Sequence, residues 1–213
     1  MAIEFHYYLA VWGFIAANVM SPGPNVLNTI TTAMGSGRRA GLAAAVGVGC
    51  GIIVWCLGMS LGMAALFALF PVAQSALRLL GAGFLIWFAS RYLRSSWRGF
   101  HRHPATLTGV GGLTERAAFF RSLSVIALNP KALTTWLFLL SIFPIAKAQA
   151  GDVALLCAGT IGVASGIHAA YALVFSTPRA ARVYLRAAPW INLVVGLFFL
   201  SVAAELTLSV FKP

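Results

Sequence analysis

Polar side chains recur at helical spacing along one face of the first apolar stretch of the sequence. They follow one another at steps of three or four residues, at Asn18, Ser21, Asn25, Asn28 or Thr29, and Thr32. Such side chains are costly against lipid, so we expect them to face the interior of a helix bundle or a water-filled cavity. Any one of them could simply bond a neighbouring helix. The set as a whole, which we call the polar stripe, favours a substrate path.

Proline interrupts the polar stripe and recurs in a second apolar stretch. The two interruptions read Ser21-Pro22-Gly23-Pro24-Asn25 and Asn129-Pro130-Lys131. Proline removes a backbone donor and clashes with the preceding turn, so each helix must kink or open there. A helix that restarts after an opening presents free N–H groups and a partial positive charge, which suit a carboxylate. We hypothesise that an amino acid's α-carboxylate binds there, with its ammonium group facing the opened carbonyls or the hydroxyls of the stripe.

Three ionisable residues within apolar stretches could act in such a path. Lys131 follows Pro130 at the second interruption, although its side chain could instead extend to the cytoplasmic surface. His168 lies far from either surface, and its near-neutral pKa makes it the natural candidate for a proton relay, unless it only bonds a neighbouring carbonyl. Glu205 is the only carboxylate inside an apolar stretch and is the second relay candidate.

The elements that must position these residues are membrane-spanning helices. The 213 residues are 60% hydrophobic and 9% charged, against about 25% charged in soluble domains. A spanning helix needs roughly 20 apolar residues. The apolar stretches cover residues 5–34, 41–69, 73–93, 122–143, 153–176 and 190–210. We therefore expect one all-α transmembrane domain over 1–213, with six spanning helices, of which the first and fourth are broken by proline.

Basic residues alternate between the connections and predict the orientation. The first, third and fifth connections carry Arg38, Arg39, Arg91, Arg94, Arg98, Arg102, Arg116, Arg121, Arg179, Arg182 and Arg186. The opposite side and its margins carry only Arg78, Lys147 and Lys212. By the positive-inside rule the odd connections are cytoplasmic and both termini lie outside. The net charge of +11 therefore reflects topology rather than binding to nucleic acid.

The two halves of the sequence share features that predict an inverted repeat. Three spans per half make the second half begin on the opposite side of the membrane, as in transporters with inverted-topology repeats. The halves cover 1–98 and 116–213, and a basic cytoplasmic loop over 94–121 joins them. Small residues at spacings of four or seven predict close helix packing in the second and fifth spans. These positions are Gly47, Gly51, Gly58, Gly62, Gly162 and Gly166.

Cysteine and histidine spacing gives little sign of a redox or metal site. Cys50, Cys56 and Cys157 lie inside apolar stretches and form no CxxC motif, so we interpret them as buried small hydrophobic residues. His101 and His103 lie in a long loop that we interpret as a solvated, partly flexible linker, and they lack further ligands. We expect no cofactor and no metal.

Two motifs together resemble a known family. The first is Ser-Pro-Gly-Pro-Asn at 21–25 with Gly-Arg-Arg-Ala-Gly at 37–41, and the second is Phe120-Arg121 leading to Leu-Asn-Pro-Lys-Ala at 128–132. The pair resembles the lysine-exporter family (LysE/RhtB type) of amino-acid efflux proteins. The resemblance implies a proton-driven exporter of amino acids or close derivatives in the bacterial inner membrane. It identifies the functional signature as Pro22, Gly23, Pro24, Asn25, Asn129, Pro130 and Lys131.

One position departs from the family pattern. Members typically carry an aspartate directly after the glycines of the second span, whereas Ile52 follows Gly51 in this sequence. Because the carboxylate is missing, the resemblance favours a neutral or less polar substrate over a cationic one.

Two other classes of function compete with export. An intramembrane enzyme needs clustered Ser and His, paired carboxylates or metal ligands, and this sequence offers a single mid-membrane histidine. We therefore expect no enzyme. A non-transporting membrane subunit or scaffold stays open, with the polar stripe as its assembly surface. The expected partners are an amino-acid-like small molecule, protons and the lipid bilayer, with a homo-oligomer left open.

Overall fold

The computed structural model describes the backbone of residues 3–69, 72–101 and 107–211, with side chains except at 63–68, 72–79, 130, 146, 205–206 and 209–211. Within these ranges the secondary structure is helical throughout and contains no strand. The elements are α1 (Phe5–Met20), α2 (Pro24–Leu69), α3 (Val72–Phe100), α4 (Glu115–Ala127), α5 (Pro130–Ile142), η1 (Ile145–Lys147), α6 (Ala150–Val174) and α7 (Pro178–Phe211). The predicted all-α class is confirmed.

Several of these helices are long and apolar enough to cross a membrane. Among the described residues they are Pro24–Gly62, Ala150–Val174 and Pro178–Ala204. Helices α4 and α5 meet at an angle of 59° and form a fourth candidate as one bent span. The arrangement of six spans in two inverted halves stays a prediction. In it, α1 together with the start of α2 forms one of the two remaining spans, and α3 forms the other.

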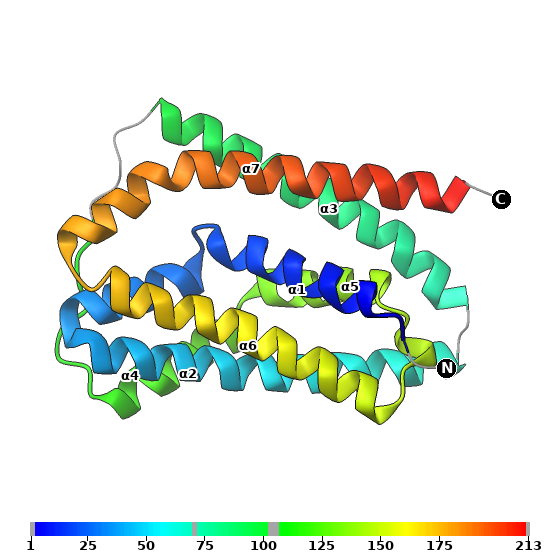
Figure 1. Cartoon of the computed structure of the whole chain (residues 1–213), viewed down its shortest axis with the longest axis horizontal. Coiled ribbons are helices and arrows are strands. Elements are labelled where there is room, and N and C mark those ends of the chain that lie inside the picture. The colour runs from blue at the N-terminus through cyan, green and yellow to red at the C-terminus, as the bar shows by residue number, and fades with distance from the viewer. Residues whose placement is uncertain (1–2, 70–71, 102–106, 212–213) are drawn as a thin grey trace.

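Helix α2 contains a sharp turn at Gly37. The φ angle of this residue is 89°, in the left-handed region that glycine adopts without a steric penalty. Figure 1 shows the chain reversing direction at this point, so residues 24–36 and 38–69 form two separate legs. The predicted connection at Arg38 and Arg39 is therefore a sharp turn that joins two helical legs directly, without a loop between them.

The two ends of the bundle differ in charge. Figure 1 shows the Gly37 turn, the end of α3, the start of α4 and the α6–α7 connection at one end, on the left. The start of α1, the end of α2, the start of α3, the α5–α6 connection and the end of α7 lie at the other. The predicted cytoplasmic arginines fall on the elements of the first end, apart from Arg102, which lies outside the described residues.

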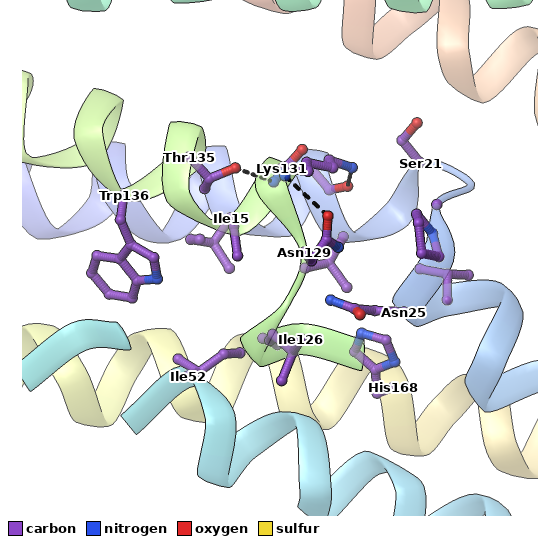
Figure 2. A pocket seen from close by; sticks show the side chains of 17 residues that line it. Ile15, Ser21, Asn25, Ile52, Ile126, Asn129, Lys131, Thr135, Trp136 and His168 are labelled. Carbon is purple, nitrogen blue, oxygen red and sulfur yellow. Dashed lines mark hydrogen bonds between the residues drawn. The ribbon is translucent and has the colours of Figure 1, made fainter. Parts of the chain in front are cut away.

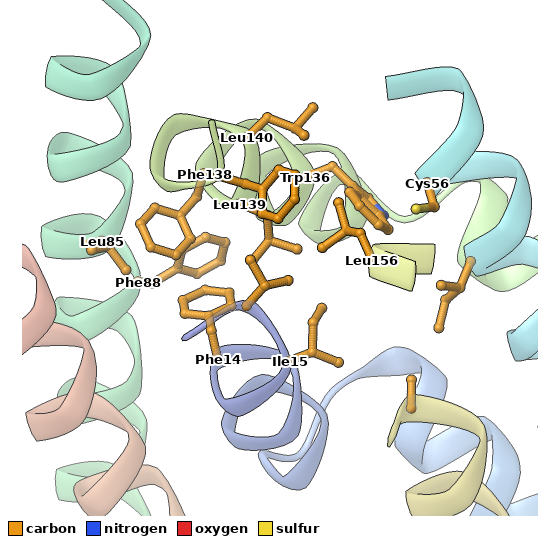
Figure 3. Close-up of a cluster of buried hydrophobic side chains, with 14 of the residues drawn as sticks. Phe14, Ile15, Cys56, Leu85, Phe88, Trp136, Phe138, Leu139, Leu140 and Leu156 are labelled. Carbon is orange, nitrogen blue, oxygen red and sulfur yellow. The ribbon is translucent and has the colours of Figure 1, made fainter. Parts of the chain in front are cut away.

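Helix packing divides the bundle into two parts. The most extensive contacts join α2 to α4 and α6, and α3 to α7, while α5 bridges toward α3. An aromatic core fills the space between α1, α3, α5 and α7 (Figure 3). In it the ring of Phe14 lies 4.4 Å from that of Phe138 and 4.5 Å from that of Phe199, measured between centroids. This core supports α1 and α5 close to the points where the chain is broken.

Two predicted connections are more ordered than the sequence indicated. The predicted connection from Arg179 to Ala188 forms the first turns of α7, where the Thr177 hydroxyl accepts a hydrogen bond from the Ala180 N–H. Good helix formers and exposed arginines explain this continuation. Residues 107–114 of the predicted linker are tied to α2, because the Val110 N–H donates to the Thr31 carbonyl and the Ser36 hydroxyl donates to the Val110 carbonyl. His103 lies outside the described residues.

The predicted glycine packing faces are only partly correct. Gly47 and Gly51 lie against α4, where a Cβ atom would meet Phe119 and Ile126 respectively. Gly58 and Gly62 share that face of α2, but α4 ends at Ala127 and the chain bends away, so they meet open space. Gly162 and Gly166 of α6 also meet open space, because α6 buries the opposite face, with Thr160, Ala164 and His168.

The interpretation of all three cysteines as plain hydrophobic residues is wrong. Cys56 of α2 and Cys157 of α6 form a disulfide, and Cys50 is the free cysteine of the described residues. A separation of 101 positions in sequence gives no hint of this pairing. The contact arises because α2 and α6 pack along one another.

Candidate functional site

The two proline interruptions lie together in the bundle and enclose a cavity of about 70 Å³ (Figure 2). Helix α1 ends at Met20 and α2 begins at Pro24, while α4 ends at Ala127 and α5 begins at Pro130. The predicted site residues that line the cavity are Asn18, Ser21, Gly23, Pro24, Asn25, Asn129, Lys131 and His168. Pro22 lines a neighbouring cavity, described below.

The opened end of α1 is held by side chains from other helices. The carbonyl of Met20 accepts hydrogen bonds from the hydroxyls of Tyr171, at 3.0 Å, and Tyr184, at 3.2 Å. The carbonyl of Asn18 accepts one from the Lys131 ammonium, at 3.2 Å. The last carbonyls of a helix have no partner within it, so these three side chains stabilise an otherwise costly buried end.

The first turn of α2 lines the cavity. Gly23 precedes the helix and offers no side chain to bond the first turn, and Pro24 has no N–H group. Asn25 and Val26 follow and both line the cavity. Their N–H groups lie in the first turn, where backbone donors have no intrahelical acceptor and the helix dipole favours an anion.

The start of α5 is built differently. The side chain of Asn129 caps the helix, because its Oδ1 accepts a hydrogen bond from the Lys131 N–H at 3.0 Å. Proline at 130 then occupies the first position of the helix, which suits its fixed φ angle. This cap fixes the backbone of Lys131 at the edge of the cavity.

The Lys131 side chain extends into the cavity, and not to the cytoplasmic surface. Its ammonium lies 3.2 Å from the Asn18 carbonyl oxygen and 5.3 Å from the centre of the Tyr92 ring. Within the described side chains the only ion pair joins His6 to Glu4, so no carboxylate neutralises Lys131 there. The cavity therefore contains a partly buried cation that lacks an anionic partner among these residues.

Polar side chains connect the breaks to helices α3, α5 and α7. The Tyr92 hydroxyl donates to Asn18 Oδ1 at 2.9 Å, and Asn18 Nδ2 donates to Thr135 Oγ1 at 3.2 Å. The Ser21 hydroxyl donates to Asn192 Oδ1 at 2.6 Å. Asn18 and Ser21 therefore serve as fixed links of the first break as well as lining residues.

The rest of the polar stripe is buried along the first leg of α2, as expected. Asn28, Thr29 and Thr32 are each at most 7% exposed. Asn28 Nδ2 donates to Ser122 Oγ of α4 at 3.2 Å. Three buried oxygens of the stripe have no hydrogen-bond partner in the described part of the chain, namely Asn25 Oδ1, Asn28 Oδ1 and Thr32 Oγ1. Buried polar atoms are rarely left unpaired, so this row is suited to water or to a polar ligand.

The two broken segments run antiparallel across each other. Asn18, before the first break, bonds Thr135, after the second. Asn28, after the first break, bonds Ser122, before the second. The crossed pairing brings the opened end of α1 to the capped start of α5.

The two relay candidates differ in what the structure describes. His168 is 1% exposed, lines the cavity, and has its Nδ1 2.8 Å from the Thr29 hydroxyl. The side chain of Glu205 lies outside the described residues. In the described part of the chain, no group of three or more His, Cys, Asp or Glu side chains could hold a metal ion.

The cavity is polar at one end and apolar at the other. The polar end holds Lys131 and the opened helix ends, and the apolar wall consists of Ile15, Ile52, Ile126, Trp136 and Ala164. Ile52 is 5% exposed and reaches the cavity from the second leg of α2 (Figure 2). The position at which the resembling family typically has an aspartate thus contributes to the apolar wall.

A larger cavity of about 380 Å³ adjoins the first. The two share Gly23, Pro24, Asn129 and Lys131. The remaining lining residues of the larger cavity come mainly from α3 and α7: Trp87, Phe88, Arg91, Tyr92, Ser95 and Asn192, with Pro22 and Thr134. Lys131 therefore lies at the junction of a small inner cavity and a larger one.

Sequence reasoning missed several side chains that support this site. Three are tyrosines, Tyr92, Tyr171 and Tyr184, and two are Thr135 and Asn192. A buried tyrosine hydroxyl needs a partner, so tyrosines within apolar stretches were an available signal. Which group each hydroxyl bonds depends on the fold.

Comparison with known proteins gives consistent matches over most of the chain. A family model described as LysE type translocator matches residues 16–210. A leucine efflux protein from Enterobacter sp. (strain 638) is 31% identical, over 88% of this chain and 89% of the relative. Uncharacterized membrane proteins from Pseudomonas aeruginosa and Vibrio cholerae are 33% and 28% identical, over 59% and 67% of this chain and 56% and 65% of their own lengths. No solved structure matches.

Proposed function

Because the chain belongs to the LysE type translocators, we propose that it exports a neutral, apolar amino acid or a close derivative across the bacterial inner membrane in exchange for protons. Membership of this family makes the protein a transporter and not an enzyme. The relative that is a leucine efflux protein, matched over nearly its whole length, supports an amino acid as the substrate.

The observation that carries the proposal is the Lys131 cation between the two breaks, which has no carboxylate partner among the described side chains. Lys131 and the uncapped first turn of α2, at Asn25 and Val26, line the same cavity. An α-carboxylate would supply the missing negative charge and accept hydrogen bonds from both sources. In the proposed bound state, the substrate carboxylate therefore lies between Lys131 and the N-terminus of α2.

The apolar wall supports a neutral substrate with a hydrocarbon side chain. A carboxylate held at Lys131 would direct the side chain toward Ile52 and Ile126. Desolvating a second positive charge against that wall would be costly, since no described carboxylate lines the cavity. Leucine is the test substrate, because its hydrocarbon side chain suits the apolar wall and because one relative is a leucine efflux protein.

Transport requires a change of conformation. The inner cavity of about 70 Å³ is smaller than the roughly 300–1,000 Å³ of pockets that bind small molecules, whereas the neighbouring cavity of about 380 Å³ falls within that range. The larger cavity is lined by the half of α3 that carries Arg91, toward the end proposed to be cytoplasmic. A substrate from the cytoplasm would enter there and pass Lys131 on its way out.

The proposed topology has six spans, with α1 beginning and α7 ending on the periplasmic side. The arginine-rich end of the bundle and the antiparallel crossing of the broken segments both support this arrangement. A single domain over 1–213 would then contain two inverted halves of three spans. The proton would be carried by His168, which lines the cavity, or by Glu205.

An export assay in cells and in vesicles tests the proposal. Bacteria that lack their own leucine exporters and are fed a leucine-containing dipeptide should accumulate less free leucine when the protein is expressed. Proteoliposomes containing the purified protein should move leucine under an imposed proton gradient. If neither system exports leucine or another neutral amino acid, while a second membrane protein co-purifies stoichiometrically, the scaffold interpretation replaces this one.

A further inference from the structure

Resting on the proposed function, we propose that His168 and Asn25 form the subsite for the substrate's ammonium group. We further propose that this ammonium and the transported proton compete for one atom, Nε2 of His168. The carboxylate and ammonium of an amino acid would then bind at separate places in the cavity. Figure 2 shows Asn25 and His168 apart from Lys131.

The contact between Thr29 and His168 is the basis for assigning the proton of neutral His168 to one ring nitrogen. The Thr29 hydroxyl has a single hydrogen, and it donates this to the Asn25 main-chain carbonyl at 3.1 Å. While it donates there, it can only accept from His168, whose Nδ1 lies 2.8 Å away. The proposal therefore assigns the hydrogen of neutral His168 to Nδ1 and the free lone pair to Nε2.

The proposed subsite has two acceptors, Nε2 of His168 and Oδ1 of Asn25. The hydrogen bond of His168 to the described residues is made through Nδ1, with Thr29, and the residue is 1% exposed. Asn25 Oδ1 is buried and has no partner among the described residues. Both residues line the cavity. Two acceptors in one cavity fit a donor with several hydrogens, and a primary ammonium has three.

Few charged or titratable groups face His168 from the elements around it. Lys131 of α5 lines the same cavity, and the Tyr171 ring of α6 lies 6.3 Å from the imidazole ring. Tyr184 of α7 packs on Tyr171, and Tyr92 of α3 packs near the Lys131 ammonium. The described carboxylates do not line the cavity. The charge state of the subsite therefore depends on His168.

Competition for Nε2 would couple export to proton entry. A proton from periplasmic water that binds the Nε2 lone pair turns the acceptor into a donor with a positive charge. The substrate ammonium keeps its three hydrogens, loses one of its two acceptors, and is repelled by the new positive charge into the outer solution. When the site faces the cytoplasm, Nε2 releases that proton to water and can accept a new ammonium. One proton enters for each amino acid that leaves.

Binding to the purified full-length protein in nanodiscs tests this proposal, with leucine and 4-methylpentanoate as probes. The second probe keeps the carboxylate and the hydrocarbon chain but lacks the ammonium. His168→Ala should weaken leucine binding at least tenfold and leave 4-methylpentanoate within about twofold at pH 7. The affinity of the wild type for leucine should fall as the pH is lowered from 7 to 3.5. In His168→Gln, which retains an acceptor but cannot be protonated, the affinity should no longer fall over this range.

A second pair of variants covers the case in which His168 variants fail to fold. Thr29→Val removes the hydroxyl that fixes the tautomer and should weaken leucine binding several-fold, whereas Thr29→Ser should retain it. If leucine binding keeps its pH dependence in His168→Gln, or if both probes weaken equally in His168→Ala, this proposal is overturned while the export function stands. Absence of both leucine binding and amino-acid export would overturn the proposed function and this inference with it.

Discussion

The Lys131 ammonium donates a hydrogen bond to the main-chain oxygen of Asn18, 3.2 Å away, and so links the second helix break to the first. The carbonyl is at the opened end of α1, and the lysine is in the first turn of α5. A single neutral acceptor does not cancel a full positive charge. The link therefore holds the cation in place and leaves it available to an anion.

Removal of this cation is expected to impair export strongly. Lys131→Ala should lower the initial rate of leucine export from proteoliposomes by roughly 10–100-fold, because a hydrogen bond to a charged group contributes about 1.5–3 kcal/mol. Lys147→Ala is the matched control, since that lysine is exposed in η1. Equal rates for the Lys131→Ala protein and the wild type, at equal protein content, would rule out a role for Lys131.

Ile52 is expected to set the size of the substrate side chain. Ile52→Ala shortens a side chain of the apolar wall and so enlarges the cavity. In competition assays, the ratio of phenylalanine export to leucine export should therefore rise roughly tenfold. Ile53→Ala is the matched control, because Ile53 is 39% exposed and does not line the cavity. An unchanged ratio of phenylalanine to leucine export in Ile52→Ala would place the substrate side chain elsewhere.

Features that depend on the solvent and on the local backbone were predictable from the sequence. Burial of Asn28, Thr29 and Thr32 follows from the cost of polar groups in lipid. The break before Pro24 and the start of α5 at Pro130 follow from the missing N–H group and fixed φ angle of proline. These rules act on each segment separately, and so a single sequence is enough to apply them.

Features that depend on which helices meet could not be predicted in the same way. The face of α2 with Gly58 is uncovered only because α4 ends early, and that end is set by a break in another segment. The bonds from Tyr171 and Tyr184 to Met20 require three helices to converge. Spacing along one helix specifies a face but not the neighbour that covers it.

The contrast between Gly47 and Gly58 gives a test of the packing. Gly47→Ala should destabilise the protein by about 1–3 kcal/mol, because the new Cβ would press on the Phe119 carbonyl and Ser122. Gly58→Ala should have no such effect, since nothing lies within 4 Å of that position. Thermal unfolding in detergent measures both variants. Equal melting temperatures for the two would mean that α4 does not pack closely at Gly47.

The Cys56–Cys157 disulfide predicts both a thiol count and an orientation. After denaturation without reductant, alkylation and mass spectrometry should find one modified cysteine, Cys50, and reduction should raise the number to the three in the sequence.

Cys157 lies about two turns from the start of α6, at the end of the bundle proposed to face the periplasm. Disulfides form in that oxidising compartment and rarely in the cytosol. Protein from cells without a periplasmic disulfide oxidase should therefore show three reactive thiols before reduction. Three reactive thiols in protein from normal cells would contradict the disulfide, and with it this evidence for orientation.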